Sequence, residues 1–192
     1  MRSLLVSLLL AASAPAFATT YDVDPVHSQI GFAVTHMMVS TVHGSFSVVS
    51  GTVEYDAAHP ENTKVTGKIG IASVDTNSVD RDKHLVSADF FDAAAFPEMT
   101  FTSTAVKNVT KTTFDLVGDL TIRGKTKPVT FKVNRLAPEF KDPWGNIKSG
   151  TSATATINRQ DFGVAWNTAL DGGGYVVGDE VALTLDLELL KK

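Results

Sequence analysis

The chain has 192 residues, a formal net charge of −4 at pH 7 and no cysteine. The absence of cysteine excludes disulfide bonds, thiol catalysis, cysteine-ligated metal sites and lipid attachment through a cysteine. The mild negative charge, without any run of Lys or Arg, excludes the electrostatic footprint of a nucleic-acid-binding protein or a polybasic membrane anchor.

The first eighteen residues have the three parts of a secretory signal peptide. Arg2 precedes an apolar run at residues 4–12, and Ala16-Phe17-Ala18 is typical of a cleavage site. The apolar run is shorter than the roughly 20 residues that cross a bilayer, which argues against a retained membrane anchor. We expect cleavage after Ala18, export to the periplasm, and one domain over residues 19–192.

The rest of the chain alternates apolar and polar residues, as β-strands with one buried face do. In chain order, this pattern predicts strands at residues 28–36, 42–55, 64–74, 99–106, 114–122, 129–133, 147–159 and 181–189. The second strand contains Ser50-Gly51, where we expect a β-bulge. In the first strand, Ile30, Phe32, Val34 and His36 share one face, so His36 is a candidate for the interior.

Residues 79–101 interrupt this alternation with charged and aromatic side chains. Ser78 can cap a short helix, on which Arg81 and His84 lie three residues apart and share a face. With the free N–H groups of a helix start, these two side chains could hold an anion such as a phosphate. Alternatively, the neighbouring aspartates only pair with Arg81 and Lys83 at a solvated surface.

A second short turn follows the predicted helix. Asp89 can begin it, Pro97 ends it, and between them Phe90 and Phe91 can turn inward. The two turns form a helical excursion around residues 78–96. We expect this excursion to cover one mouth of the sheet structure.

The connections and strand lengths favour a closed barrel over a two-sheet sandwich. Turn signals at Gly124-Lys125, at residues 143–146 and at residues 172–174 predict sequential antiparallel strands. Several strands reach ten residues, against a usual length of about five or six, as in barrels that hold one small ligand. The predicted fold is therefore all-β, an eight-stranded antiparallel up-and-down β-barrel.

One strand carries a row of small residues on a single face. Ser149, Thr151, Ala153 and Ala155 alternate with larger residues between Ile147 and Ile157. If this face points inward, the small side chains leave volume for a guest molecule. They could equally accommodate large Phe and Leu side chains across the interior, and the sequence leaves both alternatives open.

Catalysis and metal binding have weaker support in the sequence. A barrel enzyme, a hydrolase or isomerase acting on a hydrophobic substrate, would use His36 or His84 as general base, but no recognisable nucleophile motif accompanies them. No two histidines have helical i,i+4 spacing or a His-x-His strand spacing, so we predict no metal site. We also expect no cofactor.

Six motifs, in order, make the chain resemble the YceI-like proteins of bacteria, secreted lipid-binding barrels that are similar to lipocalins. The resemblance covers nearly all of residues 19–192. It is carried by DPVHSQIGFAVTH at residues 24–36, Gly44-Ser45-Phe46, RDKHLVSADFFDAAAFPEMTF at 81–101, GDLTIRGKTKPV at 118–129, NRQDFG at 158–163 and VGDEVALTLDLEL at 177–189.

The resemblance implies a carrier of a polyisoprenoid lipid, an isoprenoid quinone or a prenyl phosphate, held in the barrel interior. It implies a head-group site at His36, Arg81 and His84. It implies that the tail contacts mostly aromatic side chains, namely Phe32, Phe46, Phe90, Phe91, Phe101, Leu116, Leu120, Phe131 and Trp166.

One departure from the family pattern bears on the head group. Relatives often carry a basic residue around the glycine before Phe46, whereas His43 and Ser45 flank Gly44 here. A less cationic site favours a quinone over a pyrophosphate. Transient membrane contact and a homodimer stay open.

Overall fold

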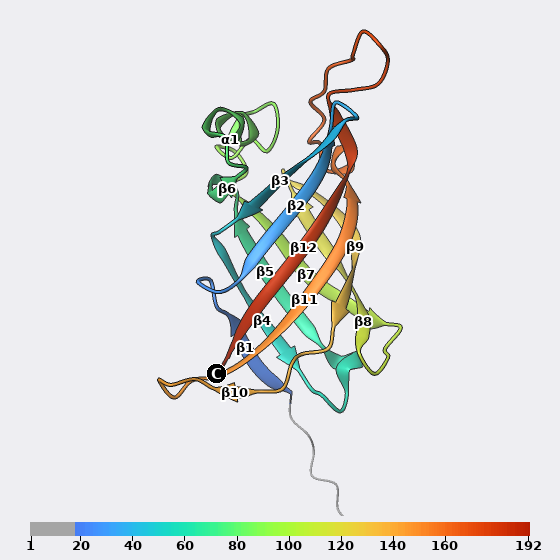
Figure 1. The fold of residues 1–192 in the computed structure, drawn as a ribbon. Helices are drawn as coiled ribbons and strands as arrows, with labels where there is room; N and C mark the ends of the chain where they lie inside the picture. Colours follow the sequence, from blue (N-terminus) through green and yellow to red (C-terminus); the bar gives the residue numbers. More distant parts are fainter. Residues whose placement is uncertain (1–17) are drawn as a thin grey trace, which may run out of the picture.

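The computed structural model describes residues 18–192, so the predicted leader lies outside the described residues except for Ala18. Strands dominate this part of the chain (Figure 1). They are β1 (Thr19–Val23), β2 (Gln29–His36), β3 (Ser40–Phe46), β4 (Val49–Tyr55), β5 (Lys64–Gly70), β6 (Val74–Asp75), β7 (Glu98–Lys107), β8 (Thr113–Ile122), β9 (Lys125–Asn134), β10 (Phe140–Lys141), β11 (Ile147–Asn158) and β12 (Val177–Lys191). Helix α1 (Val79–Val86) and the short 3-10 helices η1 (Pro60–Asn62), η2 (Ile71–Ser73) and η3 (Arg159–Phe162) complete the described elements.

The twelve strands occupy eight positions around a closed antiparallel barrel. β1 and β2 share one position because both pair with β12, and β4 and β3 share the next position. β5 and β6 share the third, since β5 pairs with β4 and β6 pairs with β3. β7, β8, β9 and β11 follow in order, β10 shares the position of β9 because both pair with β11, and the pairing of β11 with β12 closes the ring. The predicted eight-stranded, up-and-down barrel is confirmed.

Alternation along β8 shows how the sequence forms the barrel wall. Phe114, Leu116, Leu120 and Ile122 are buried on the inner face, while the residues between them are partly or fully exposed. Gly118 lies in the same inward row. A one-residue slip of this strand would turn every one of these apolar side chains to solvent, so burial fixes the register.

The predicted strand at residues 42–55 is divided in two, and the bulge predicted at Ser50-Gly51 is wrong. β4 pairs with β5 without a register shift from Val49 to Glu54. The irregularity lies earlier, where the N–H groups of Ser47 and Val48 donate to the Oγ of Ser73. A side chain distant in sequence therefore replaces the ladder partner there.

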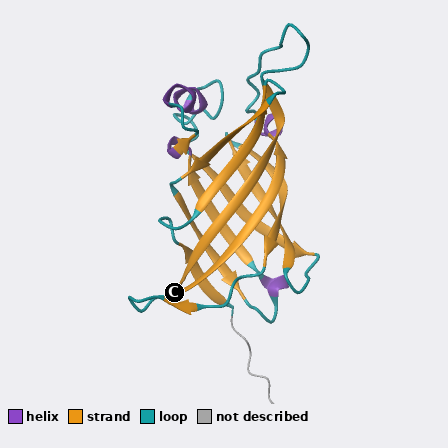
Figure 2. Cartoon of the chain, in the orientation of Figure 1, coloured by secondary structure: helices purple, strands orange, loops and turns teal. Residues whose placement is uncertain are grey.

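The predicted helical excursion is present. Ser78 is the N-cap of α1 and accepts a hydrogen bond from the N–H of Arg81 at 3.5 Å. After α1 the chain makes two tight turns, in which the N–H of Phe91 donates to the carbonyl of Leu85 and that of Phe96 donates to Asp92. Figure 2 shows the helix off one end of the strands.

The barrel has two distinct ends, named here as they lie in Figure 1. The upper end carries α1 with residues 87–97, the turn between β2 and β3, and the loop at residues 163–176. The lower end carries β10, the start of β1 and the C-terminus. Among residues 18–192, no helix is both long and apolar enough to span a membrane.

Candidate functional site

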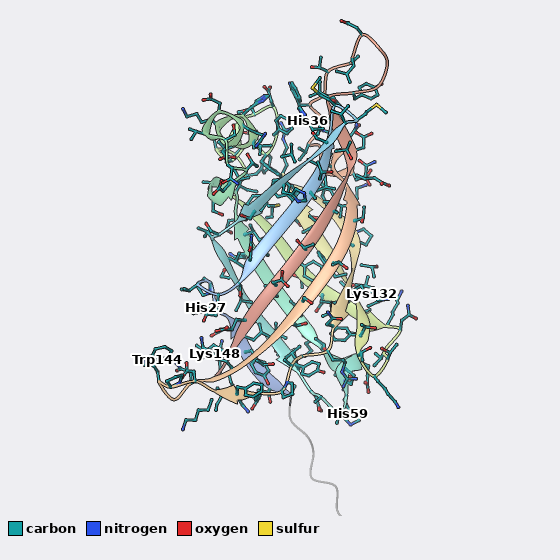
Figure 3. The ribbon with its side chains drawn as sticks, viewed as in Figure 1. His27, His36, His59, Lys132, Trp144 and Lys148 are labelled. Atoms are coloured by element: carbon teal, nitrogen blue, oxygen red, sulfur yellow. The ribbon has the colours of Figure 1, made fainter. Side chains whose placement is uncertain are left out.

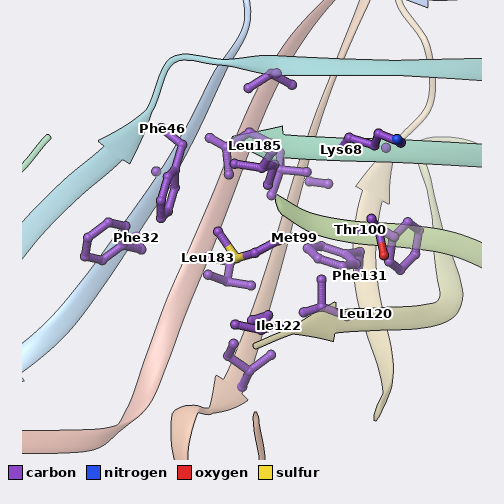
Figure 4. A pocket seen from close by; sticks show the side chains of 18 of the residues that line it. Phe32, Phe46, Lys68, Met99, Thr100, Leu120, Ile122, Phe131, Leu183 and Leu185 are labelled. Atoms are coloured by element: carbon purple, nitrogen blue, oxygen red, sulfur yellow. The ribbon is translucent and has the colours of Figure 1, made fainter. Parts of the chain in front are cut away.

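The barrel encloses an apolar cavity of about 220 Å³ (Figure 4). Side chains from around the barrel line it, and most of them are aromatic or aliphatic. Leu85 and Val177 line it toward the upper end, and Phe114 and Leu136 line it toward the lower end. The cavity therefore follows the barrel along its length.

Eight of the nine side chains that the resemblance assigned to a ligand tail line this cavity. They are Phe32, Phe46, Phe90, Phe91, Phe101, Leu116, Leu120 and Phe131. Thr151, Ala153 and Ile157 on β11 also line it, so the face of small residues points inward. Whether these side chains contact a lipid tail stays a prediction.

Two glycines leave the space that the rings of Phe32 and Phe101 occupy along the cavity. A Cβ at Gly44 would lie 2.3 Å from the Cζ of Phe32, and a Cβ at Gly118 would lie 2.3 Å from the Cζ of Phe101. Such distances are far below van der Waals contact, so each ring occupies space that any other residue would fill. Phe101 then meets Phe131 edge to face, with ring centroids 5.3 Å apart.

Buried polar groups that face the cavity form hydrogen bonds within the protein. The Oγ1 of Thr63 donates to the carbonyl of Pro60 at 2.6 Å, and that of Thr151 donates to the carbonyl of Asn134 at 2.7 Å. Among the described residues, no buried side-chain nitrogen or oxygen lacks a partner. Because an unpaired buried polar group costs about 1–3 kcal/mol, this interior favours an apolar occupant.

Arg159 is a buried charged residue of the cavity lining that the sequence analysis missed. It is only 5% exposed, and its guanidinium donates to the carbonyls of Val164, Trp166, Val177 and Gly178. Its Nη2 also lies 3.3 Å from Asp179. Burial lowers the pKa of Arg159 and Asp179 opposes this effect, but an arginine stays charged in proteins. Arg159 thus anchors both ends of the loop at residues 163–176.

Arg81, a predicted head-group residue, is engaged close to the cavity wall. Its Nε donates to the Oγ1 of Thr76 at 2.7 Å and its Nη2 donates to the Thr76 carbonyl at 2.6 Å. The Oγ1 of Thr76 in turn donates to Asp82. Thr76 and Phe32 both lie next to the point where a Cβ of Gly44 would stand, and Phe32 lines the cavity. Because Arg81 is bound to Thr76, its guanidinium is one side chain away from the cavity lining.

His84 belongs to a cluster of rings rather than to the cavity lining. Its Nε2 lies 3.0 Å from the Oδ2 of Asp89. Its ring meets Phe90 and Trp166 edge to face, at centroid distances of 4.9 and 5.1 Å. Trp166 packs on Phe90 at 5.2 Å and is not among the residues that line the cavity, so its contact with a lipid tail stays a prediction.

His36 lies at the upper end of β2 (Figure 3), opposite Val177 of β12. Ile30, Phe32 and Val34 of the same strand line the cavity as the alternation predicted, whereas His36 is half-buried beyond them. In the described part of the chain, no hydrogen bond or ion pair joins His36, Arg81 and His84 to one another. An assembled anion site from these three residues therefore stays a prediction.

The one group of metal-type ligands found among residues 18–192 is Asp24, His27 and Glu188. Lys148 already bridges it, because its Nζ donates to both carboxylates. Asp24 also accepts from the N–H of Val26 and binds His27 at 2.9 Å, and these bonds, the one to His27 foremost, lower the pKa of Asp24. The DPVHS motif thus fixes the turn between β1 and β2.

The closed barrel and its apolar interior define a lipocalin-like β-barrel protein. A family model described as YceI-like domain matches residues 21–189, so the chain belongs to the YceI-like family. A UPF0312 protein of Pseudomonas savastanoi pv. phaseolicola is 42% identical over 158 residues, which cover 82% of each chain. A UPF0312 protein of Pseudomonas fluorescens is 40% identical over 166 residues, covering 85% of this chain and 86% of the relative.

Solved structures share the fold. BcnA of Burkholderia cenocepacia superposes with a TM-score of 0.75 at 26% identity, covering 86% of this chain and 98% of BcnA. The YceI protein of Campylobacter jejuni gives 0.69 at 32% identity, covering 82% and 90%. A polyisoprenoid binding domain from Saccharophagus degradans gives 0.65 at 16% identity, covering 91% and 99%, which shows a common fold.

Proposed function

We propose that this protein binds and carries a polyisoprenoid lipid in the periplasm. The observation that carries the proposal is the apolar cavity along the barrel, whose buried polar groups already form hydrogen bonds within the protein. Burial of apolar surface is worth about 25 cal/mol per Å², so such a lining recognises a hydrocarbon chain by area and shape. The likeness to the Saccharophagus degradans domain, a polyisoprenoid binding domain, supports this ligand class.

The head group would remain at the upper end, beside Arg81 and His36. Arg81 already donates two hydrogen bonds to Thr76, so a phosphate would have to compete with them. A quinone oxygen needs only one donor and no compensating charge. An isoprenoid quinone is therefore the head group that we favour over a prenyl phosphate.

We expect binding rather than catalysis. His84 and Asp89 do form the pair that orients a general base, but His84 is packed between Phe90 and Trp166 and is not part of the cavity lining. A substrate held in the cavity would not meet its imidazole. We also propose that residues 1–18 direct export, which predicts a periplasmic protein beginning at Thr19.

The test is the lipid content of matched variants on β11. Ala153 lines the cavity, so Ala153→Phe fills it, whereas Thr154→Phe adds the same ring on the exposed outer face. Organic extraction and mass spectrometry should find a prenyl lipid in the wild type and in Thr154→Phe. Ala153→Phe should retain at least about tenfold less, because the tail and the ring compete for one volume.

Two outcomes would contradict the proposal. One is a wild-type extract without prenyl lipid from protein exported in several hosts. The other is equal lipid content in folded Ala153→Phe and Thr154→Phe proteins, which would place the lipid outside the barrel. Circular dichroism of both variants verifies that the fold is retained.

A further inference from the structure

The turn between β2 and β3 has an unusual conformation for its residues. Met37 and Met38 have φ angles of 49° and 60°, and the N–H of Val39 donates to the carbonyl of His36 at 3.1 Å. Two successive positive φ angles are also what a type I′ turn requires, and Asn-Gly is the sequence that adopts them most readily. A side chain in this region costs roughly 1 kcal/mol per residue, so two methionines destabilise the turn.

These residues also expose apolar surface. Met37 is partly exposed, Met38 is 69% exposed and Val39 is 84% exposed. Core packing does not account for such side chains, and the local backbone disfavours them. An unfavourable conformation combined with exposed apolar groups is typical of a site kept for function.

The loop at residues 163–176 adds to the same tip. The N–H of Met37 donates to the carbonyl of Val176 at 2.7 Å, and the Sδ of Met38 lies against Gly174, 2.3 Å from where a Cβ would stand. Tyr175, next in the chain, is 60% exposed. We call Met37, Met38, Val39 and Tyr175 the apolar tip, and it stands at the upper end of the barrel in Figure 1.

The two segments that form the apolar tip carry almost no charge. The turn at residues 37–40 has no ionisable side chain, and Asp171 is the one side chain of the loop at residues 163–176 that is charged at neutral pH. A surface that binds anionic lipids or nucleic acids carries Lys or Arg, and neither residue occurs in these two segments. Methionine side chains adapt to irregular apolar surroundings, and tyrosine suits the boundary between lipid and water.

We propose that the apolar tip docks this protein onto an uncharged or zwitterionic lipid bilayer, with the upper end of the barrel facing the membrane. The purpose of such docking, lipid exchange, rests on the proposed function. The tip is continuous with the cavity end, because Val177, which follows the loop, lines the cavity. A protein partner is disfavoured, since stable protein interfaces use about 20–30 residues per side, far more than this tip offers.

A second exposed apolar pair lies at the lower end and supplies the control. Phe140 and Trp144 are both well exposed, close to Lys141. Trp144 lies at the lower end (Figure 3), and β10, which contains Phe140, lies at the same end, away from α1 (Figure 1). If exposed apolar residues bound bilayers wherever they occur, both pairs would contribute equally.

The experiment compares flotation with phosphatidylcholine vesicles for the wild type, Met37→Asn/Met38→Gly and Phe140→Ser/Trp144→Ser. The first variant installs the preferred type I′ sequence, so it should fold at least as stably as the wild type. Its partitioning onto vesicles should fall at least about tenfold, because two apolar side chains are lost from the contact. The lower-end variant should bind like the wild type.

Salt and lipid charge test the mode of contact. Binding should persist at high salt and should not require anionic lipid, since screening weakens contacts between charges and not apolar burial. The proposal is overturned if the wild type does not bind, if the lower-end variant alone loses binding, if Met37→Asn/Met38→Gly binds unchanged, or if salt abolishes binding.

The two proposals fail separately. The Met37→Asn/Met38→Gly protein should still yield prenyl lipid on extraction, because neither methionine lines the cavity. Vesicle binding that needs the apolar tip, in a protein without prenyl lipid, would overturn the proposed function and leave the docking intact. Lipid in both proteins with equal vesicle binding would overturn the docking alone.

Discussion

The two ends of the barrel are closed by different contacts. At the lower end, side chains of the strands form hydrogen bonds with the segment that follows β9. Tyr21 of β1 donates to Glu139 at 2.6 Å, and Lys191 of β12 binds the same carboxylate. Arg135, just after β9, donates to the hydroxyl of Tyr55 in β4 and to carbonyls of two lower loops.

The upper end is covered by segments that are not part of the barrel wall. Phe90, His84 and Trp166 form a cluster of three rings between the α1 excursion and the loop at residues 163–176. Arg123, in the turn between β8 and β9, donates to the carbonyls of Ala88 and Gly163 and so ties the same two segments.

The difference indicates which end can open. Opening the lower end would separate strands that the ladder and a hydrogen-bonded network hold together. Moving the α1 excursion at the upper end requires only that the rings separate and a few partly exposed hydrogen bonds break, while Arg159 holds the loop at residues 163–176 and the ladders stay paired. We therefore expect ligand to enter and leave past α1, and the following changes test this asymmetry.

The largest effect is expected for Arg159→Met. Arg159 is buried and donates to four carbonyls, all of which would lose a charged donor. We expect the free energy of unfolding, measured with urea, to fall by about 3 kcal/mol or more. Arg135→Met at the lower end, where the guanidinium is only partly buried, should cost less. A larger loss for Arg135→Met would reverse the order.

The ring cluster should show an intermediate effect. Trp166→Ala removes the ring that packs on both His84 and Phe90, and because Trp166 is only partly buried we expect a loss of about 2 kcal/mol. Release of bound lipid to acceptor vesicles should be several-fold faster. Trp144→Ala, an exposed tryptophan at the lower end, is the matched control and should change neither quantity. Unchanged release from Trp166→Ala would argue against an upper exit.

Much of the fold follows from alternation, because one buried face sets the register of each strand. The inward row on β8 and the inward Ile30, Phe32 and Val34 on β2 were predicted from parity alone. The cap at Ser78 was predicted because capping is local in sequence. The barrel was favoured by strand length and short turns.

Other features depend on contacts that no local pattern contains. Arg159 has the inward parity of Ala153 and Ile157, so alternation alone could have placed it inside, but its carbonyl partners come from residues 164–178 on the far side of a loop. Trp166 was assigned to the tail, but its position depends on how that loop meets α1. The break before Val49 depends on Ser73, a residue from another barrel position.

The smallest effect concerns Tyr21 at the lower end, and pH reveals it. Burial, aided by the hydrogen bond to Glu139, raises the pKa of Tyr21 to about 12. The unfolded chain has a tyrosine pKa of about 10. The folded state therefore holds this proton more tightly, and the resulting stability is complete below pH of about 10 and is lost as the pH rises toward about 12.

Tyr21→Phe should lower the free energy of unfolding by about 1 kcal/mol at neutral pH, because Glu139 loses a donor. The variant should then lose less stability than the wild type as the pH rises through that alkaline window, since its side chain carries no proton to release. Tyr175→Phe, an exposed residue of the apolar tip, is the control and should follow the wild type. Parallel alkaline unfolding curves for Tyr21→Phe and the wild type would show that this hydrogen bond does not stabilise the lower end.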